Sequence, residues 1–512
     1  MRPIPSRSLA RARRPLVALL AAAVLAGCAS THGLAPQTSP RDPDTLAVAK
    51  SFDGHLSPAA WPTRDWWHAW GDPQLDALMT EALAGTPSLA AADARVRKAQ
   101  AQAELADAAR QPGATGSVRY SGAYLPQTLV PAPFGGDYKG VELGMVQFAY
   151  APDLWGGHRD RWEAAVDLAH AAEADAQQAR LLLSSNLAHT YIGLAQAFEA
   201  KTVAEREGAR ARQQLDLARR RARAGLDNAV QTRQAEGAVA AAAQQAGAAQ
   251  QRIDALRNAL AALTGQGPDR GLAIQPPALL AVDAPTLPSD VPSELLGHRP
   301  DVVAARWRAE AASKGVDAAK TDFYPSVNLS AMVGIAAGKL SDLFTRDAAF
   351  GTGGPAISLP IFNGRRLRGQ LASTDADADL AYAQYDQSVV GALREVADAL
   401  QAARALDAQI ASLADAREAA RKAQALAETR RRAGLGTQLD VLAAQRPVYQ
   451  LDAQIAGLRA ERRNVAADLA VALGGGFAPA APEPPSLDAP AATQSASEPA
   501  PESSSTSSRT AP

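Results

Sequence analysis

The chain has 512 residues, a formal net charge of −1 at pH 7 and only 5% aromatic residues. A nearly balanced charge gives no overall basic surface of the kind that binds nucleic acid, so no nucleic-acid partner is expected. The abundance of alanine favours long helices that approach one another closely over a thick globular core of large side chains. The single cysteine, Cys28, excludes a disulfide within the chain.

The sequence gives no support to an enzyme. It contains no phosphate-binding loop, no His-Glu-x-x-His, no Cys-x-x-Cys and no nucleophile elbow, and no two of its seven histidines stand at metal-ligand spacing. We therefore expect no catalytic residue, no metal and no cofactor other than a covalent lipid.

Residues 1–27 have the organisation of a secretory signal peptide. Five arginines lie within the first 14 residues, and a short apolar run follows them. This run is shorter than the ~20 residues that a helix needs to cross a bilayer. The sequence Leu25-Ala26-Gly27-Cys28 resembles the bacterial lipobox, so cleavage is expected to leave Cys28 at the new N-terminus.

The lipobox implies that Cys28 carries a diacylglycerol and an N-acyl chain. Two or more acyl chains anchor a protein stably, whereas a single chain gives only marginal binding. Ala29 and Ser30 follow the cysteine, with no aspartate to retain the protein at the inner membrane, so transfer to the outer membrane is favoured. The alternative is a buried structural cysteine beside an ordinary cleavage site.

An internal repeat organises the rest of the chain. Four pairs of segments match in the same order at offsets of 207 to 213 residues, which predicts a duplicated unit of about 210 residues. The matching pairs are 87–95 with 300–308, 153–159 with 360–366, 224–226 with 433–435, and 263–265 with 473–475. We expect a lipidated leader over 28–60, the first unit over 61–267, a Pro-rich connector over 268–292, the second unit over 293–476 and a disordered Ala/Pro/Ser tail over 477–512.

The sequence of each unit predicts the same order of helices and strands. A helix closed by a proline, at 87–111 and again at 300–323, precedes two segments with strand character. A stretch of about 70 residues without an internal proline follows, on the order of 100 Å long as a helix, and a second helix returns. The strands are expected near 114–124, 139–150, 326–336 and 351–361, and the long helices over 157–263 and 365–473, each broken once by a turn.

Apolar residues recur at spacings of three and four along the long helices. In the second unit the series runs through Val389, Leu393 and Val396, which is typical of a left-handed coiled coil. The core face of an ordinary helix bundle gives the same spacing, but globular helices rarely exceed about 25 residues. The unbroken length therefore favours antiparallel coiled coils.

The strand segments alternate apolar and polar residues. Val327, Leu329 and Ala331 share one face, and Asn328 and Ser330 lie on the other. Segments of about 10 residues with this alternation match strands of membrane barrels, although a strand of a soluble protein can look the same. Four strands leave open edges, which lipid does not tolerate. The membrane interpretation therefore requires subunits to share one barrel, and three of them would supply twelve strands.

Together these features resemble the TolC-like outer membrane factor family, in the lipoprotein (NodT-type) branch that serves RND-type multidrug efflux systems. The resemblance covers nearly the whole mature chain, from Trp66 to Leu473. Besides the lipobox, it rests on the Trp-rich segment 65–75, His298-Arg299-Pro300-Asp301-Val302, Phe323-Tyr324-Pro325, Leu359-Pro360-Ile361-Phe362-Asn363-Gly364, and the segment 433–442.

The resemblance implies a mainly α protein with a small β part. Three subunits would share a 12-stranded β-barrel in the outer membrane, continued by a long α-helical barrel of antiparallel coiled coils in the periplasm. A periplasmic adaptor and an inner-membrane pump, of RND type, would dock below, and the pump would supply the energy. Trp66, Trp67 and Trp70 are expected to pack the leader against the middle of the helical barrel.

The turns of the two helical hairpins are candidate contacts for the adaptor. Glycine allows the left-handed conformation that ends a helix, and the resemblance implies that these turns project farthest from the membrane. Asp227-Asn228 stand where the second turn has Gly436-Thr437, which leaves the equivalence of the two turns open. A turn without any partner is the alternative. The candidate residues are Gly225, Leu226, Gly434, Leu435, Gly436 and Thr437.

Asp440 is the candidate residue of a periplasmic gate. It follows the second turn closely, and the resemblance implies an acidic residue there that faces the lumen at the closed mouth. Three symmetry copies would bring like charges together, which raises pKa values and attracts cations. Gln231 and Ala443 stand where further acids could lie, so any acidic ring would be thin. The alternative is a solvated aspartate or an ion pair within the helix.

We therefore predict a passive trimeric exit duct in a tripartite efflux system, lipid-anchored and integral to the outer membrane, for drugs or other toxic small molecules. Two alternatives stay open. The same fold could serve as the duct of a type I protein secretion system, or the chain could be a lipid-anchored coiled-coil scaffold without a pore.

Overall fold

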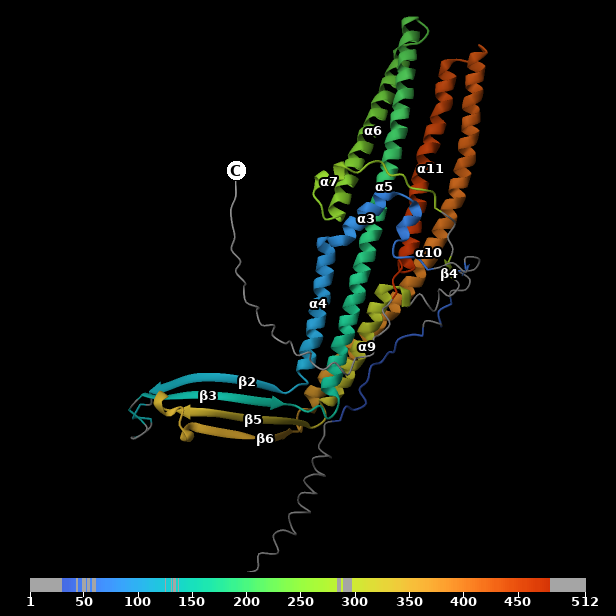
Figure 1. Cartoon of the computed structure of the whole chain (residues 1–512). Coiled ribbons are helices and arrows are strands. Elements are labelled where there is room, and N and C mark those ends of the chain that lie inside the picture. The colour runs from blue at the N-terminus through green and yellow to red at the C-terminus, as the bar shows by residue number, and fades with distance from the viewer. Residues whose placement is uncertain are drawn as a thin grey trace, which may run out of the picture.

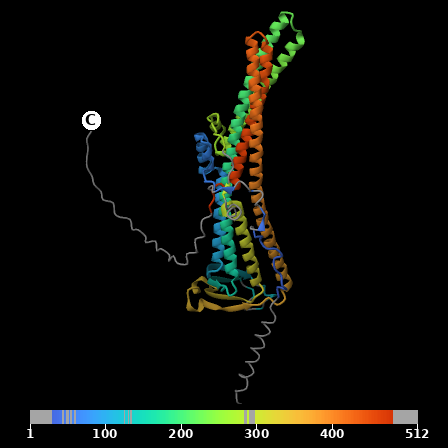
Figure 2. The same cartoon turned by 90° about the vertical axis from the view of Figure 1, so that its right-hand side faces the viewer.

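The computed structural model describes residues 30–478, apart from 43–44, 48–51, 53–55, 58–60, 125, 130, 132–134, 137, 283–286 and 289–296. The expected signal peptide, Cys28, and nearly all of the expected C-terminal tail lie outside the described residues, as do parts of the leader and the connector. The described chain consists of long helices that extend in one direction from a small sheet, as both views show (Figure 1, Figure 2).

Two helical hairpins account for most of the length. In the first, α5 (Gly157–Arg223) turns into α6 (Ala229–Leu263), and in the second, α10 (Gly364–Arg432) turns into α11 (Gln438–Ala472). α5 has 67 residues and α10 has 69, which correspond to about 100 Å each. α6 packs along α5 and α11 along α10, so the expected antiparallel pairs are confirmed. Among the described residues, no helix has both the length and the apolar composition needed to cross a bilayer.

Shorter helices flank the half of the hairpins that lies near the sheet (Figure 1). α4 (Pro87–Ala108) packs against α5, and α9 (Pro300–Thr321) packs against both α5 and α10. Both begin with proline. Proline lacks an N–H, but the N–H groups of the first helical turn have no acceptor within the helix, so no hydrogen bond is lost there. Both end shortly before the expected positions 111 and 323. The remaining short helices are η2 (Trp66–Trp70), α3 (Pro73–Gly85), α7 (Pro268–Leu272), η3 (Leu340–Asp342) and η4 (Arg346–Ala348).

Four antiparallel strands form the main sheet in the order β2-β3-β5-β6. They are β2 (Gly113–Tyr124), β3 (Tyr138–Tyr150), β5 (Ser326–Ala337) and β6 (Ala349–Ser358). β6 ends before the expected position 361, and Pro360, which has no N–H for a ladder, follows it. The pairing of β3 with β5 joins the two repeated units. A two-residue parallel pair, β1 (Leu56–Ser57) with β4 (Leu287–Pro288), was not expected from the sequence.

The register divides this sheet into two faces, because residues directly opposite one another share a face and successive residues alternate. The apolar face includes Val118, Val146, Phe148, Leu329, Val333 and Ile357, and the polar face includes Thr115, Ser117, Arg119, Gln147, Asn328, Ser330 and Thr352. Val118 is 90% exposed and Ile357 is 73% exposed. The apolar face therefore has no cover within the single chain.

The helices bury two large hydrophobic clusters and a small one around Ala174, Val303 and Ala304. One brings Trp66, Trp67 and Trp70 together with buried residues of α3, α5 and α6, among them Tyr191. The rings of Trp66 and Trp70 meet edge to face at 5.5 Å between centroids. This confirms that the Trp-rich segment packs against the middle of the helices. The second large cluster lies between α9, α10 and the end of α11, and includes Val389 and Val396 from the expected heptad series.

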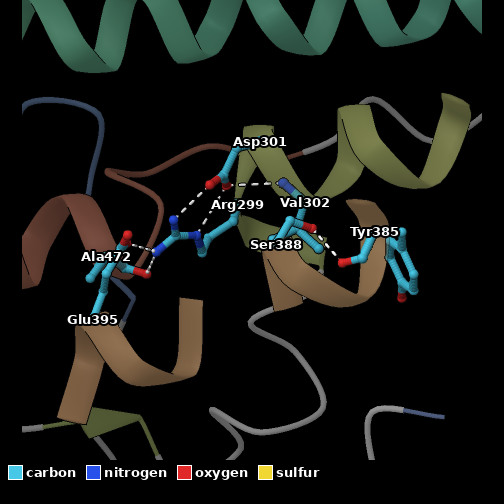
Figure 3. A network of polar contacts seen from close by, with 7 residues as sticks. All are labelled: Arg299, Asp301, Val302, Tyr385, Ser388, Glu395 and Ala472. Atoms are coloured by element: carbon cyan, nitrogen blue, oxygen red, sulfur yellow. Dashed lines mark hydrogen bonds and ion pairs between the residues drawn. The ribbon is translucent and has the colours of Figure 1, made fainter. Parts of the chain in front are cut away.

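Arg299, at the start of α9, connects three helices through one buried side chain (Figure 3). Its guanidinium donates to the carboxylate of Asp301 at 2.7 and 3.0 Å and to Glu395 of α10 at 2.8 Å. It also donates to the carbonyl oxygen of Ala472, the last residue of α11, at 3.1 Å. Only 6% of the side chain is exposed. Arg299 thus joins the sheet-distal end of α9 and the C-terminal end of α11 to the middle of α10.

We expect Arg299→Ala to lower the free energy of unfolding by about 2 kcal/mol, because a buried carbonyl and two half-exposed carboxylates lose their donor. The measurement is the thermal unfolding midpoint of the purified protein. Arg306→Ala is the matched control, since Arg306 lies on the same helix and makes an exposed ion pair with Glu310 and a contact with the ring of Trp307, but no buried hydrogen bond. Equal midpoints for the two variants would contradict the role given to Arg299.

Candidate functional site

The sheet ends in two strands that are paired on one side only. Within the described residues, β2 pairs with β3 alone and β6 pairs with β5 alone. Each therefore presents a row of backbone N–H and C=O groups without partners in the sheet. Such an edge is a template for pairing with another chain.

The helical layer ends at the same two sides as the sheet. α5 packs against α4 and α9, and α9 packs against α10, which gives the order α4-α5-α9-α10. α4 leads into β2, and α10 follows β6. We call these two sides the seams: one is formed by β2 and α4, the other by β6 and α10. A further copy could continue both layers at once, with its β2 beside β6 and its α4 beside α10.

Rotational repetition at the seams closes a ring, and closure is the arrangement that removes sheet edges altogether. The helices would then form a tube below a closed barrel. A subunit of this design fits a ring-shaped channel, because its two seams are completed only by further copies.

The two hairpin turns lie at the ends of the hairpins farthest from the sheet (Figure 1, Figure 2). In the first, Gly225 has φ +69°, and the N–H of Leu226 donates to the carbonyl of Arg221 at 2.9 Å. In the second, Gly434 has φ +74°, and the N–H of Leu435 donates to the carbonyl of Arg430 at 2.8 Å. These are the left-handed glycine caps that end long helices.

The two turns are equivalent despite their different sequences. Asn228 caps α6 by accepting from the N–H of Val230 at 2.8 Å, and Thr437 caps α11. Leu226 is 67% exposed and Leu435 is 73% exposed. Each turn therefore presents an apolar side chain to its surroundings, in the same place on both hairpins.

The arginines beside the first turn are partly engaged with neighbouring acids. Arg221 donates to Asp227 at 2.8 and 3.1 Å, and this contact lowers the pKa of the Asp227 carboxyl. Arg220 pairs with Asp216 one turn earlier on α5. Three arginines of this run, Arg219, Arg220 and Arg221, thus pair with acids of the same hairpin.

Asp440 lies in the first turn of α11, where it completes a capping box with Thr437. The backbone N–H and the hydroxyl of Thr437 donate to the Asp440 carboxylate at 2.7 and 2.8 Å, and the N–H of Asp440 donates to the Thr437 hydroxyl at 3.3 Å. These hydrogen bonds lower the pKa of Asp440 within the single chain. From the sequence we expected three neighbouring copies of Asp440 to raise its pKa. The hydrogen bonds within the single chain act in the opposite direction. The spacing Thr-x-x-Asp was the available signal for this cap.

The structure brings the six turn residues and Asp440 together at the far end of the molecule. Cys28 lies outside the described residues. Among the described residues, no group of three or more His, Cys, Asp or Glu side chains could hold a metal. Sequence reasoning missed Arg299, because its partners come from three separate helices.

The comparisons with known proteins agree with this geometry. The family model described as "Outer membrane efflux protein" matches residues 78–266 and 291–475. The fusaric acid resistance protein FusA of Burkholderia cepacia is 38% identical over 366 residues, which cover 70% of this chain and 69% of FusA. The multidrug resistance outer membrane protein MdtP of Shigella flexneri is 31% identical over 469 residues, 89% of this chain and 94% of MdtP. The solved structure of the outer membrane protein VceC from Vibrio cholerae matches with a TM-score of 0.74 and 35% identity, over 81% of this chain and all of VceC.

The chain belongs to the outer membrane efflux protein family. It is an outer-membrane efflux duct whose fold is that of trimeric channels with a helical barrel and a β-barrel. The family comprises channels and not enzymes. Its members function as trimers, with an adaptor and an inner-membrane pump in tripartite systems. The scaffold alternative is thereby set aside.

The capping box predicts a local effect at one turn. Thr437→Val removes the hydroxyl that caps α11, which costs about 1 kcal/mol and speeds amide exchange in that first turn about fivefold. Because the pKa of Asp440 is lowered, the stabilisation by its carboxylate is present near neutral pH and is lost only as the pH falls below about 3.9, the ordinary value.

Hydrogen exchange with mass spectrometry of peptides around 438–441 checks this effect. Asn228→Ala is the control, because it removes the cap of α6. It should speed exchange only at the start of α6, beside the first hairpin turn. Unchanged exchange over 438–441 in Thr437→Val would show that the box contributes nothing to the tip.

Proposed function

We propose that this chain is the exit duct of a tripartite efflux system for toxic small molecules, energised by an RND-type pump through a periplasmic adaptor. The observation that carries the proposal is that both layers end at the same two seams, so that one closed ring gives a barrel and a tube on a common axis. Such a tube about 100 Å long could bridge much of the periplasm without a source of energy of its own.

The names of the relatives favour small-molecule cargo over protein cargo. FusA is named for resistance to fusaric acid, and MdtP for multidrug resistance. Export of proteins by a type I system would use the same fold, but no feature of the described chain favours it.

The hairpin tips are the part of the duct that we assign to the adaptor. Gly225, Leu226, Gly434, Leu435, Gly436 and Thr437 lie farthest from the sheet, and each tip exposes one leucine (Figure 1). An exposed apolar side chain on a rigid turn suits a partner of complementary shape. Asp440, just above the second tip, is positioned for a role at the periplasmic mouth, and the gate assignment rests on this position alone.

We also propose that Cys28 carries the lipid anchor, and the described part of the leader supports this. The backbone N–H groups of Gln37 and Thr38 donate to Asp379 of α10 at 3.1 and 2.8 Å, and the N–H of Arg41 donates to Asp386 at 2.9 Å. The leader therefore approaches the sheet end of α10 as it runs back toward residue 30. The eight residue-to-residue steps from 38 to 30 can span about 26 Å, and α10 extends about 22 Å from Asp379 to its start.

Conductance tests the proposed duct. The purified protein, reconstituted in planar bilayers, should produce discrete steps of conductance, because the closed ring leaves a continuous path for ions. The same preparation is checked for trimers by light scattering in detergent. A protein that folds and trimerises but never conducts would overturn the proposal.

Labelling with a fatty acid tests the anchor separately. Cys28→Ser should abolish incorporation of the acyl label while the sheet still inserts into the outer membrane, because insertion depends on the strands. Ser30→Ala serves as the matched control and should label normally. Persistent labelling of Cys28→Ser would refute the lipobox interpretation.

A further inference from the structure

Arg119 is a charged residue in the middle of an otherwise uncharged strand. It is the seventh of the twelve residues of β2, about 20 Å along the strand from Gly113. Its register partner on β3 is Leu143, and its neighbours Val118 and Tyr120 lie on the opposite face. The side chain is exposed, and no ion pair or side-chain hydrogen bond links it to another described residue.

The register assigns the face on which Arg119 lies. The apolar face carries Val146, Val333 and Ile357, and it must meet lipid once the sheet lies in the outer membrane. Ser117 and Arg119 lie on the polar face, which turns toward the lumen of the closed barrel.

No acidic residue of the strands can neutralise Arg119. The only acid in the four strands is Glu142, which is opposite Tyr120 and Ala337 and so lies on the other face. Glu142 lies one residue from the level of Arg119 along the sheet, but its side chain leaves the opposite face. Lys139, the other basic residue of the strands, adds no negative charge.

The neighbouring subunit does not change this balance. β2 is an edge strand, and the strand that continues the sheet there is β6 of the next copy. β6 holds no acidic and no basic residue between Ala349 and Ser358. The conclusion is therefore independent of the register at the seam, since no alignment of β6 beside β2 supplies an acid.

We propose that the three copies of Arg119 form a cationic ring midway along the barrel lumen, which favours anionic cargo, such as small organic acids, over cationic cargo. The inference rests on the proposed duct and names the class of substrate that its outer half selects. Rings of basic side chains favour anions in other pores, and a guanidinium binds a carboxylate through two parallel hydrogen bonds. The three positive charges repel cations that approach within the screening length set by the salt concentration.

The test is the reversal potential of single channels in a planar bilayer under a KCl gradient. Relative to the wild type, Arg119→Gln should shift the reversal potential toward cation preference, and Arg119→Glu should shift it further in the same direction. Arg119→Lys keeps the charge and should retain the wild-type value. The shifts should shrink as the salt concentration rises, because the ring is screened.

Two controls separate the ring from other effects. Ser117→Gln changes the polar face two residues away without a change of charge and should leave the reversal potential unaltered. Glu142→Gln removes a charge from the apolar face and should also have no effect. A shift in Glu142→Gln without one in Arg119→Gln would mean that the faces are reversed, which overturns the inference.

The failure of the inference is distinct from the failure of the duct. If the wild type conducts and Arg119→Glu has the same reversal potential, the cationic ring is refuted while the duct stands. If the trimeric wild type does not conduct at all, the proposed duct itself is wrong. Should Arg119→Glu fail to assemble, the comparison of Arg119→Gln with Arg119→Lys decides the question alone.

Discussion

The requirement that every backbone polar group in lipid finds a partner determines most of this structure. Lipid offers no hydrogen bonds, so a four-stranded sheet with two open edges cannot lie in a membrane by itself. The edges of β2 and β6 can be satisfied only by further copies of the same sheet. Oligomerisation is therefore a condition for insertion. The helical layer ends at the same seams as the sheet, because α4 leads into β2 and α10 follows β6.

The helical part meets a different demand, which is to extend far from the membrane with few large side chains. Small residues let long helices pack closely, and many of the buried residues of α5 are alanines. Larger side chains gather at the Trp-rich segment, where helices of both units converge, and Arg299 joins three helices of the second unit. The molecule is thus braced at mid-height. Nearer the tips, α5 of the first hairpin also contacts α11 of the second, and the Arg210 guanidinium donates to the carbonyl of Leu442 at 3.2 Å.

Periodic features of this fold could be predicted from sequence, and contacts between distant residues could not. The duplication, the strand alternation around Val327 and the heptads near Val389 are local patterns, and the structure has strands and helices at those places. The two-residue pair of β1 with β4 is too short to leave a pattern. The part played by Arg119 depends on register across strands, and the cap on Asp440 was overlooked although Thr437 stands three residues before it.

The pairing of β3 with β5 inside one chain reproduces what the pairing of β6 with the next β2 achieves between chains. A ring of three such chains is therefore built from six similar units. The two units of each chain have separate sequences. Arg119 illustrates the result, because the position that matches it in the second unit is Met332. Because the two units of one chain differ in sequence, a barrel wall of six similar units can carry side chains that repeat only three times around it.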